Sequence, residues 1–188
     1  MKQNLLMEHG TEEMQIVNLT EMFHDSFDEK KTDCYRRLKE LVAEEDWKNF
    51  YTGLLSSKPI SFGFELDSIA PFLVIEKEWD WLYRLLEQNE QRDRADYRNP
   101  LKYASALMTS HNAEIRAMLV RTFREYAADR IAPKRKVSAG KYTYFCDDLQ
   151  SLAGIGAKKE LIELLQYFKT EYRRRPSLMA ELRRIGTI

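Results

Sequence analysis

Apolar residues recur along the chain at the spacing that places them on one face of an α-helix. In four segments they occupy positions i, i+3, i+4 and i+7, the pattern of a helix with one buried side. The four sets are Trp47, Phe50, Tyr51 and Leu54; Trp79, Leu82, Tyr83 and Leu86; Ile115, Met118, Leu119 and Thr122; and Leu161, Leu164, Leu165 and Phe168. The first two sets align at an offset of 32 residues, with tryptophan on tryptophan and tyrosine on tyrosine. The pattern predicts four helices of one kind.

A second apolar stripe, with the spacing i, i+3, i+6 and i+7, precedes each of these helices. Its four sets are Tyr35, Leu38, Leu41 and Val42; Leu66, Ile69, Phe72 and Leu73; Leu101, Ala104, Leu107 and Met108; and Cys146, Leu149, Leu152 and Ala153. In each pair the two stripes begin 12 to 15 residues apart, which fits two short helices joined by a tight turn. One such pair cannot bury its apolar face alone, so neighbouring pairs must stack. We therefore predict an all-α fold, an α-solenoid of about four stacked antiparallel helix pairs; a compact helical bundle is the alternative.

Proline and glycine fall where these helix pairs require breaks. Asn99-Pro100 opens the third pair, because proline suits the first turn of a helix. The segment Gly154-Ile155-Gly156 supplies the turn inside the fourth pair, where glycine tolerates the left-handed backbone that ends a helix. Pro71 lies inside a first helix and is expected to kink or shorten it.

The two ends of the chain differ from the pairs. Residues 1–28 fit no pair and are predicted to form an N-terminal helical extension or cap, with Ile16, Leu19, Met22 and Phe23 at helical spacing. Residues 29–188 are predicted to be the repeat domain. Its last part, residues 176–186, is predicted to be a C-terminal cap with an inward-facing stripe of Leu178, Leu182 and Ile185, since terminal repeats are usually atypical.

The third pair resembles a known repeat family. Residues 99–104, Asn-Pro-Leu-Lys-Tyr-Ala, are similar to the ankyrin-repeat opening Thr-Pro-Leu-His-x-Ala, and residues 111–119 and 152–165 are similar to its second-helix entry and leucine pair. Lys102 replaces the histidine and Asn99 the threonine, and the second helices recur at 32, 36 and 46 residues against about 33 in the family. A HEAT or armadillo solenoid is therefore the alternative. The ankyrin resemblance implies a curved stack that binds macromolecules through a concave side formed by the first helices and the turns before them.

Composition is that of a soluble globular protein. The 188 residues are 44% hydrophobic and 32% charged. No apolar run reaches the ~18 residues that a membrane span needs, and the N-terminus has no signal-peptide pattern. Cys34 and Cys146 fit no metal spacing and are predicted to be reduced thiols in the core. These features predict a cytoplasmic location and no membrane partner.

The net charge of zero conceals an uneven distribution. Residues 1–91 hold 10 basic and 19 acidic side chains, and residues 92–188 hold 20 basic and 11 acidic ones. The two parts therefore carry −9 and +9. This asymmetry is consistent with ordinary solvated helix faces, with a basic surface for an anionic partner, or with head-to-tail contact between molecules.

Residues suited to catalysis are few. The dipeptide His24-Asp25 is of the type found in all-helical metal phosphohydrolases, which need further ligands on neighbouring helices. His9 and Asp129 are the nominees, and no pattern surrounds them. The sequence has no glycine-rich phosphate loop and no nucleophile motif. We therefore predict a protein that is not an enzyme and uses no cofactor or metal, with an HD-type metal phosphohydrolase as a remote alternative.

Basic clusters offer a second alternative, nucleic-acid binding. They are Lys134-Arg135-Lys136, Arg173-Arg174-Arg175 and Arg183-Arg184, accompanied by Arg121, Arg124 and Arg130. Such residues contact phosphates, and the four tyrosines at positions 142, 144, 167 and 172 could stack on bases. A sequence pI near 6.9 is, however, well below that of a dedicated nucleic-acid binder.

The pattern as a whole favours a non-enzymatic module that binds another protein. Trp81 lies off the inner stripe of its helix and is a candidate interface anchor. The exposed edge of the stack and the basic clusters supply the other candidates, which are Arg94, Tyr97, Arg98, Lys134, Arg135, Lys136, Arg173, Arg174 and Arg175. A small helical immunity or inhibitor protein is one specific form of this hypothesis.

Overall fold

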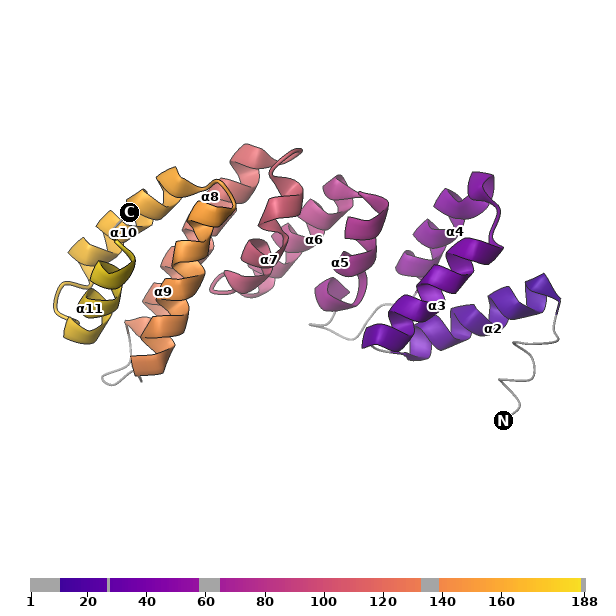
Figure 1. The fold of residues 1–188 in the computed structure, drawn as a ribbon, viewed down its shortest axis with the longest axis horizontal. Helices are drawn as coiled ribbons and strands as arrows, with labels where there is room; N and C mark the ends of the chain where they lie inside the picture. Colours follow the sequence, from indigo (N-terminus) through magenta and orange to yellow (C-terminus); the bar gives the residue numbers. More distant parts are fainter. Residues whose placement is uncertain (1–10, 27, 58–64, 133–138, 187–188) are drawn as a thin grey trace. The chain divides into compact units, whose positions relative to one another are not determined.

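The computed structural model of the protein describes residues 11–26, 28–57, 65–132 and 139–186, and these residues form helices and no strands (Figure 1). The elements are α2 (Glu12–Asp25), α3 (Asp28–Leu41), α4 (Glu44–Ser56), α5 (Glu65–Glu76), α6 (Trp79–Arg92), α7 (Arg98–Leu107), α8 (Asn112–Tyr126), the π-helical turn η1 (Ala127–Ile131), α9 (Ala139–Gly154), α10 (Lys158–Glu171) and α11 (Pro176–Ile185). The all-α prediction is confirmed.

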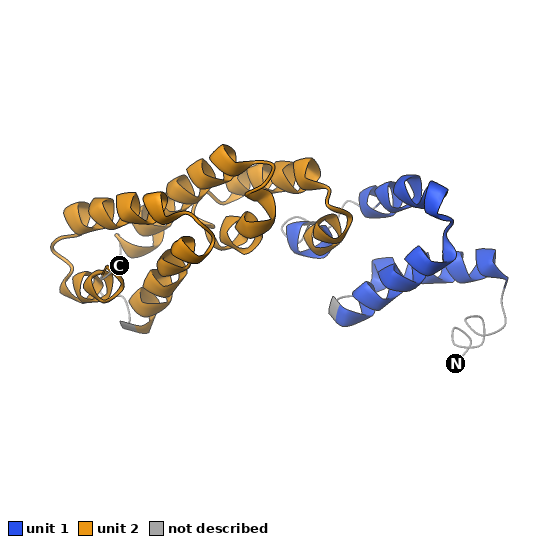
Figure 2. Ribbon diagram, turned by 45° about the horizontal axis from the view of Figure 1, so that its top comes forward, with its two compact units in different colours: residues 1–69 blue, residues 70–188 orange. Residues whose placement is uncertain are grey.

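The chain divides into two compact units, residues 1–69 and residues 70–188 (Figure 2). The boundary falls within α5. In the first unit α2 packs on α3, so the helix from the predicted N-terminal extension joins the predicted repeat domain. The predicted division at residue 28 itself stays a prediction.

Aromatic rings form the core of the first unit. Phe23 of α2 is buried, and its ring centroid lies 5.9 Å from that of Tyr35 in α3. The ring of Tyr35 in turn lies 5.3 Å from that of Trp47 in α4. Lys31 is also buried, because its ammonium lies 4.6 Å from the centre of the Phe23 ring and donates a 2.7 Å hydrogen bond to Ser68 Oγ. These contacts join four helices in one core.

In the second unit most helices pack on a neighbour in sequence. Helix α7 contacts α6 and α8, and α9 contacts α10 and α11. Helix α8 also contacts α10, so the second helices of the third and fourth pairs lie side by side (Figure 1). The prediction that helices pack in neighbouring pairs is confirmed, and the solenoid arrangement of four pairs stays a prediction.

The predicted stripes of the second helices are buried in the third and fourth pairs, where all eight positions lie in the core. Thr122, the one polar member, is fully buried because its hydroxyl donates to the carbonyl oxygen of Met118, 2.9 Å away. In the first two pairs the predicted register needs correction. Phe50, Trp79 and Tyr83 are only half-buried. A buried triplet with the spacing i, i+3, i+4 is present in all four second helices: Tyr51, Leu54 and Leu55; Leu82, Leu85 and Leu86; Ile115, Met118 and Leu119; Leu161, Leu164 and Leu165.

The turn between α9 and α10 confirms the predicted left-handed role for Gly156, whereas Gly154 is the last residue of α9. Gly156 adopts φ +80°, and its N–H donates to the carbonyl oxygen of Ala153 at 3.2 Å. The N–H of Ala157 donates to the carbonyl oxygen of Leu152 at 2.8 Å. These two bonds are the Schellman arrangement, which satisfies the last carbonyls of a helix and requires a left-handed residue.

The turn between α5 and α6 has the same arrangement with lysine in the glycine position. Lys77 adopts φ +58°, its N–H donates to Val74 at 3.3 Å, and the N–H of Glu78 donates to Leu73 at 2.9 Å. Helix α5 continues through Pro71, which lies on its exposed side, up to this turn. The predicted shortening at Pro71 is therefore not observed.

The inward-facing stripe predicted for the C-terminal helix α11 is confirmed, and its role as a cap stays a prediction. Leu178, Leu182 and Ile185 are all buried, and Pro176 occupies the first turn. Within the described residues, no helix is both long and apolar enough to cross a membrane.

Candidate partner-binding surface

The residues nominated for metal chemistry do not come together. Among the described residues, no group of three His, Cys, Asp or Glu side chains is placed to hold a metal ion. His24 Nε2 lies 3.0 Å from Ser57 Oγ, and Asp129 forms a 2.9 Å ion pair with Arg130. His9 lies outside the described residues.

Both cysteines are buried and free, as predicted. Burial raises the pKa of the Cys34 thiol above its usual range and that of Cys146 to about 12. Since the thiolate is the reactive form, neither side chain is set up as a nucleophile.

The predicted partner-binding residues fall into three groups. Lys134, Arg135 and Lys136 lie outside the described residues. Arg94, Arg98, Arg173 and Arg174 are exposed, and Trp81 is half-buried. Of the remaining two, Tyr97 is buried, and Arg175 is half-buried and hydrogen-bonded within the fold.

Tyr97 is a core residue, so its assignment to the binding surface is wrong. Its side chain is 1% exposed, and its ring stacks on that of Phe123 with the centroids 4.3 Å apart. The phenol donates a 2.7 Å hydrogen bond to Asp148 Oδ2. Burial, together with this bond to a carboxylate, raises the pKa of Tyr97 well above its usual value. Tyr97 therefore lies in the core and holds the carboxylate of Asp148 by a hydrogen bond.

Arg175 holds three elements together. Its guanidinium donates to the carbonyl oxygen of Ala132, just after η1, at 2.5 Å, and lies 3.3 Å from the Tyr142 hydroxyl in α9. Because Arg175 is also the N-cap residue of α11, these bonds fix where α11 begins. These hydrogen bonds within the fold explain the position of the Arg175 side chain, so no partner protein is needed to explain it.

Ion pairs occupy the arginines along α8. Arg116 pairs with Glu160 of α10 at 2.7 Å, and Arg124 pairs with Glu163 of the same helix at 2.7 Å. Arg121 makes a bidentate pair with Glu90 of α6, through bonds of 2.9 and 2.8 Å. The charges on the second helices are therefore directed largely at neighbouring helices of the same unit.

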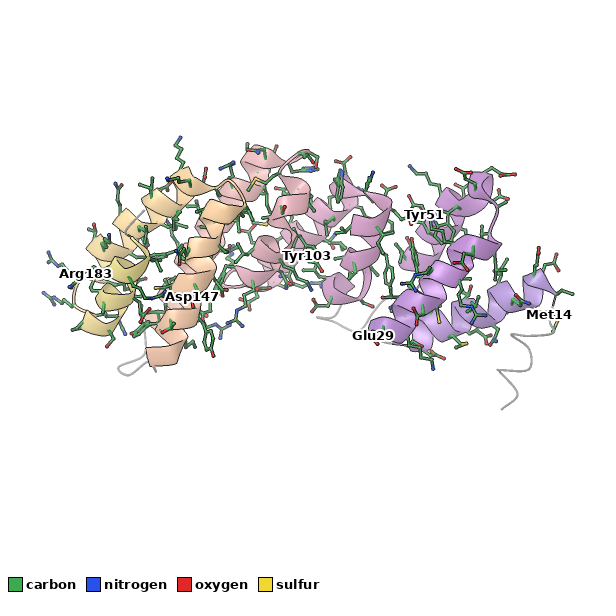
Figure 3. The ribbon with its side chains drawn as sticks, in the orientation of Figure 1. Met14, Glu29, Tyr51, Tyr103, Asp147 and Arg183 are labelled. Atoms are coloured by element: carbon green, nitrogen blue, oxygen red, sulfur yellow. The ribbon has the colours of Figure 1, made fainter. Side chains whose placement is uncertain are left out.

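The exposed side of α9 differs from that of α8 because it carries a large exposed aromatic side chain. We call it the α9 surface and define it by five residues: Arg98, Tyr144, Asp147, Asp148 and Arg184. Tyr144 is 68% exposed, more than any other large apolar side chain in the described part of the chain. Asp148, one turn further along α9, lies 3.8 Å from Arg98 of α7, and Asp147 bonds Arg184 of α11 at 2.5 Å. Figure 3 shows Asp147 on α9, on the side next to α11. Two ion pairs thus link three helices around an exposed tyrosine.

The helical phase of α9 explains this exposure. Its buried positions are Tyr142, Phe145, Cys146, Leu149 and Leu152, and Tyr144 falls between them on the opposite side. Like Trp81, Tyr144 lies off the apolar stripe of its helix, and the sequence had suggested it only as a tyrosine that could stack on bases. The pairing of Asp147 with Arg184 spans 37 positions and has no local signal in the sequence.

Comparison with protein families, curated proteins and solved structures finds no match to this chain.

Proposed function

We propose that this chain is a non-enzymatic protein-binding module that engages its partner through the α9 surface. The observation that carries the proposal is Tyr144, which leaves 68% of its side chain exposed on a surface that three helices build together. Tyrosine supplies a large contact area at a small cost in side-chain entropy and is enriched among the residues that dominate binding energy.

The two ion pairs beside Tyr144 support a protein partner. Arg98 and Asp147 are 67% and 50% exposed, so their charges remain available to a partner at the rim of an interface. Such charges determine orientation and association rate more than affinity, while the aromatic side chain at the centre supplies the affinity.

Two observations favour a protein over a nucleic acid. Arg121, Arg124 and Arg130 of the predicted basic surface pair with carboxylates. Of the four tyrosines considered for base stacking, Tyr142 and Tyr172 are buried and Tyr167 is half-buried beside Arg124. These contacts reduce the charge and ring surface that a nucleic acid could use.

We also propose that the helix pairs are repeats of one ankyrin-like unit. The buried triplet recurs in all four second helices, and Leu82 and Ile115 are 33 positions apart, the length of an ankyrin repeat. The turns at Lys77 and Gly156 share one hydrogen-bond pattern. In an ankyrin-like stack the first helices form the binding side, and α7 and α9 are the first helices of their pairs.

Affinity capture from the native host tests the binding proposal. The wild-type chain, Tyr144→Ala and Ile162→Ala are immobilised at equal density. Ile162 is the matched control, because it is an exposed apolar residue (47%) on α10, away from the α9 surface. Wild type and Ile162→Ala should retain the same stoichiometric protein, and Tyr144→Ala should lose it.

The purified partner then permits a quantitative test by titration calorimetry. Truncating a central aromatic anchor costs about 2 kcal/mol or more, about a thirtyfold loss of affinity. Equal losses for Tyr144→Ala and Ile162→Ala would contradict the α9 surface. Retention of nucleic acid in place of a stoichiometric protein would support the alternative function.

A further inference from the structure

A second surface feature, distinct from the α9 surface, lies where α10 ends. The turn between α10 and α11 encloses an open recess of about 520 Å³. Its lining residues are Thr170, Glu171, Tyr172, Arg173, Arg174 and Arg175. Three arginines and one glutamate give this recess a net positive charge.

Arg173 and Arg174 differ from the ion-paired arginines of the second unit. Six others, namely Arg98, Arg116, Arg121, Arg124, Arg130 and Arg184, lie within 4.0 Å of a carboxylate. In the described part of the chain, neither Arg173 nor Arg174 forms an ion pair, although Glu171 lies two positions away from Arg173. Their guanidinium groups are therefore available to an anion from outside.

The backbone that carries these two arginines is fixed at both ends. Tyr172 is 7% exposed, and its N–H donates to the carbonyl oxygen of Phe168 at 3.0 Å. The N–H of Arg175 donates to the carbonyl oxygen of Tyr172 at 2.9 Å, and the Arg175 side chain is bonded to Ala132 and Tyr142. A preorganised turn of this kind reduces the ordering that ligand binding would require.

We propose that this recess binds the phosphate group of a small organic phosphate, with Arg173 and Arg174 as the anion ligands. Guanidinium groups donate paired hydrogen bonds in a planar geometry that matches phosphate oxygens. The recess has the volume of small-molecule sites, which span about 300–1,000 Å³. No N-cap side chain accepts a hydrogen bond from the first N–H groups of α11, so the positive end of this helix dipole adds to the same field.

The test is a calorimetric titration of the full chain with AMP, in a buffer free of phosphate and low in chloride. Saturable binding is expected, with competition by inorganic phosphate and no binding of adenosine. The double variant Arg173→Ala/Arg174→Ala should weaken AMP binding by about tenfold or more, as charged hydrogen bonds are lost. Both side chains are exposed, so the helical circular dichroism spectrum should not change.

Lys158→Ala/Lys159→Ala is the matched control, because it removes the same charge from the opposite end of α10, where both lysines are exposed. This control should bind AMP as the wild type does. Absence of saturable AMP binding to the wild type would overturn the proposal, as would an equal loss in the control, which would indicate general charge attraction. Preferential binding of a single-stranded oligonucleotide through Arg173 and Arg174 would overturn the assignment to a small phosphate. Each result is independent of capture through Tyr144, so the two proposals can fail separately.

Discussion

Lys77 and Gly156 occupy equivalent positions in two helix turns, and this equivalence yields two substitutions with opposite effects. Lys77 adopts φ +58° and Gly156 φ +80°, a backbone region that costs a residue with a side chain about 1–2 kcal/mol. Glycine avoids this cost but loses about 0.5–1 kcal/mol more backbone entropy on folding. Lys77→Gly should therefore stabilise the second unit by about 0.5–1 kcal/mol, and Gly156→Ala should destabilise it by a similar amount.

Steric clash does not complicate the second substitution. A Cβ atom added at Gly156 would meet only Arg116 Nη2, at 4.0 Å, which is an ordinary contact. The cost of Gly156→Ala is therefore conformational. For Lys77, the control is Lys77→Ala, which removes the same charge but keeps a Cβ atom and should give no comparable gain.

Urea unfolding followed by tryptophan fluorescence measures both effects. Trp79 and Trp81 report on residues 70–188, and a Trp47→Phe background removes the signal from the first unit. The melting temperature should rise by about 2–5 °C for Lys77→Gly and fall by a similar amount for Gly156→Ala. Stabilisation by Lys77→Ala equal to that by Lys77→Gly, or a change of the same sign in the two glycine-related variants, would refute the reasoning.

Three further predictions follow from buried groups. Tyr97→Phe removes the 2.7 Å hydrogen bond to Asp148 and should lower the free energy of unfolding, measured by urea titration, by about 1 kcal/mol. An unchanged free energy of unfolding would contradict this prediction and indicate that water replaces the phenol hydroxyl as the hydrogen-bond donor to Asp148. Burial raises the pKa of Cys146 to about 12, so in a Cys34→Ser background this thiol should resist Ellman's reagent at pH 8. It should react once urea unfolds the chain. Immediate reaction in the folded state would contradict the burial of Cys146. Burial also raises the pKa of Tyr83 and Tyr172 to about 12 from the ordinary 10, so the unfolded state loses these protons first as pH rises. Stability should therefore be complete below pH 10 and decline between pH 10 and 12, with a smaller decline in Tyr172→Phe, as alkaline thermal melts would show.

Sequence periodicity predicted the helices because burial of one face repeats at helical spacing. It succeeded best at Ile115–Leu119 and Leu161–Leu165, where aliphatic residues have no polar group to keep near water. It failed by about one turn at Trp79 and Tyr83, since aromatic side chains with a polar atom also suit half-buried positions.

The candidate site was harder to predict from the sequence than the helices, because it depends on contacts between residues far apart in the chain. Burial of Tyr97 depends on Phe123 and on Asp148, which is 51 positions away, and no local pattern encodes such a contact. The pairing of Arg184 with Asp147 is equally long-range. The exposure of Tyr144 could have been predicted from the sequence, because Tyr144 is not part of the apolar stripe that its helix buries.

Site-specific photocrosslinking tests the proposed binding surface most directly. Benzoylphenylalanine replaces Tyr144 in one chain and Ile162 in another, and each chain is irradiated in the native host's extract. Since Tyr144 is the exposed centre of the α9 surface, the chain labelled at position 144 should form one dominant crosslinked protein adduct, and the chain labelled at position 162 should not. Crosslinking of that protein at position 162 and not at position 144 would contradict the account.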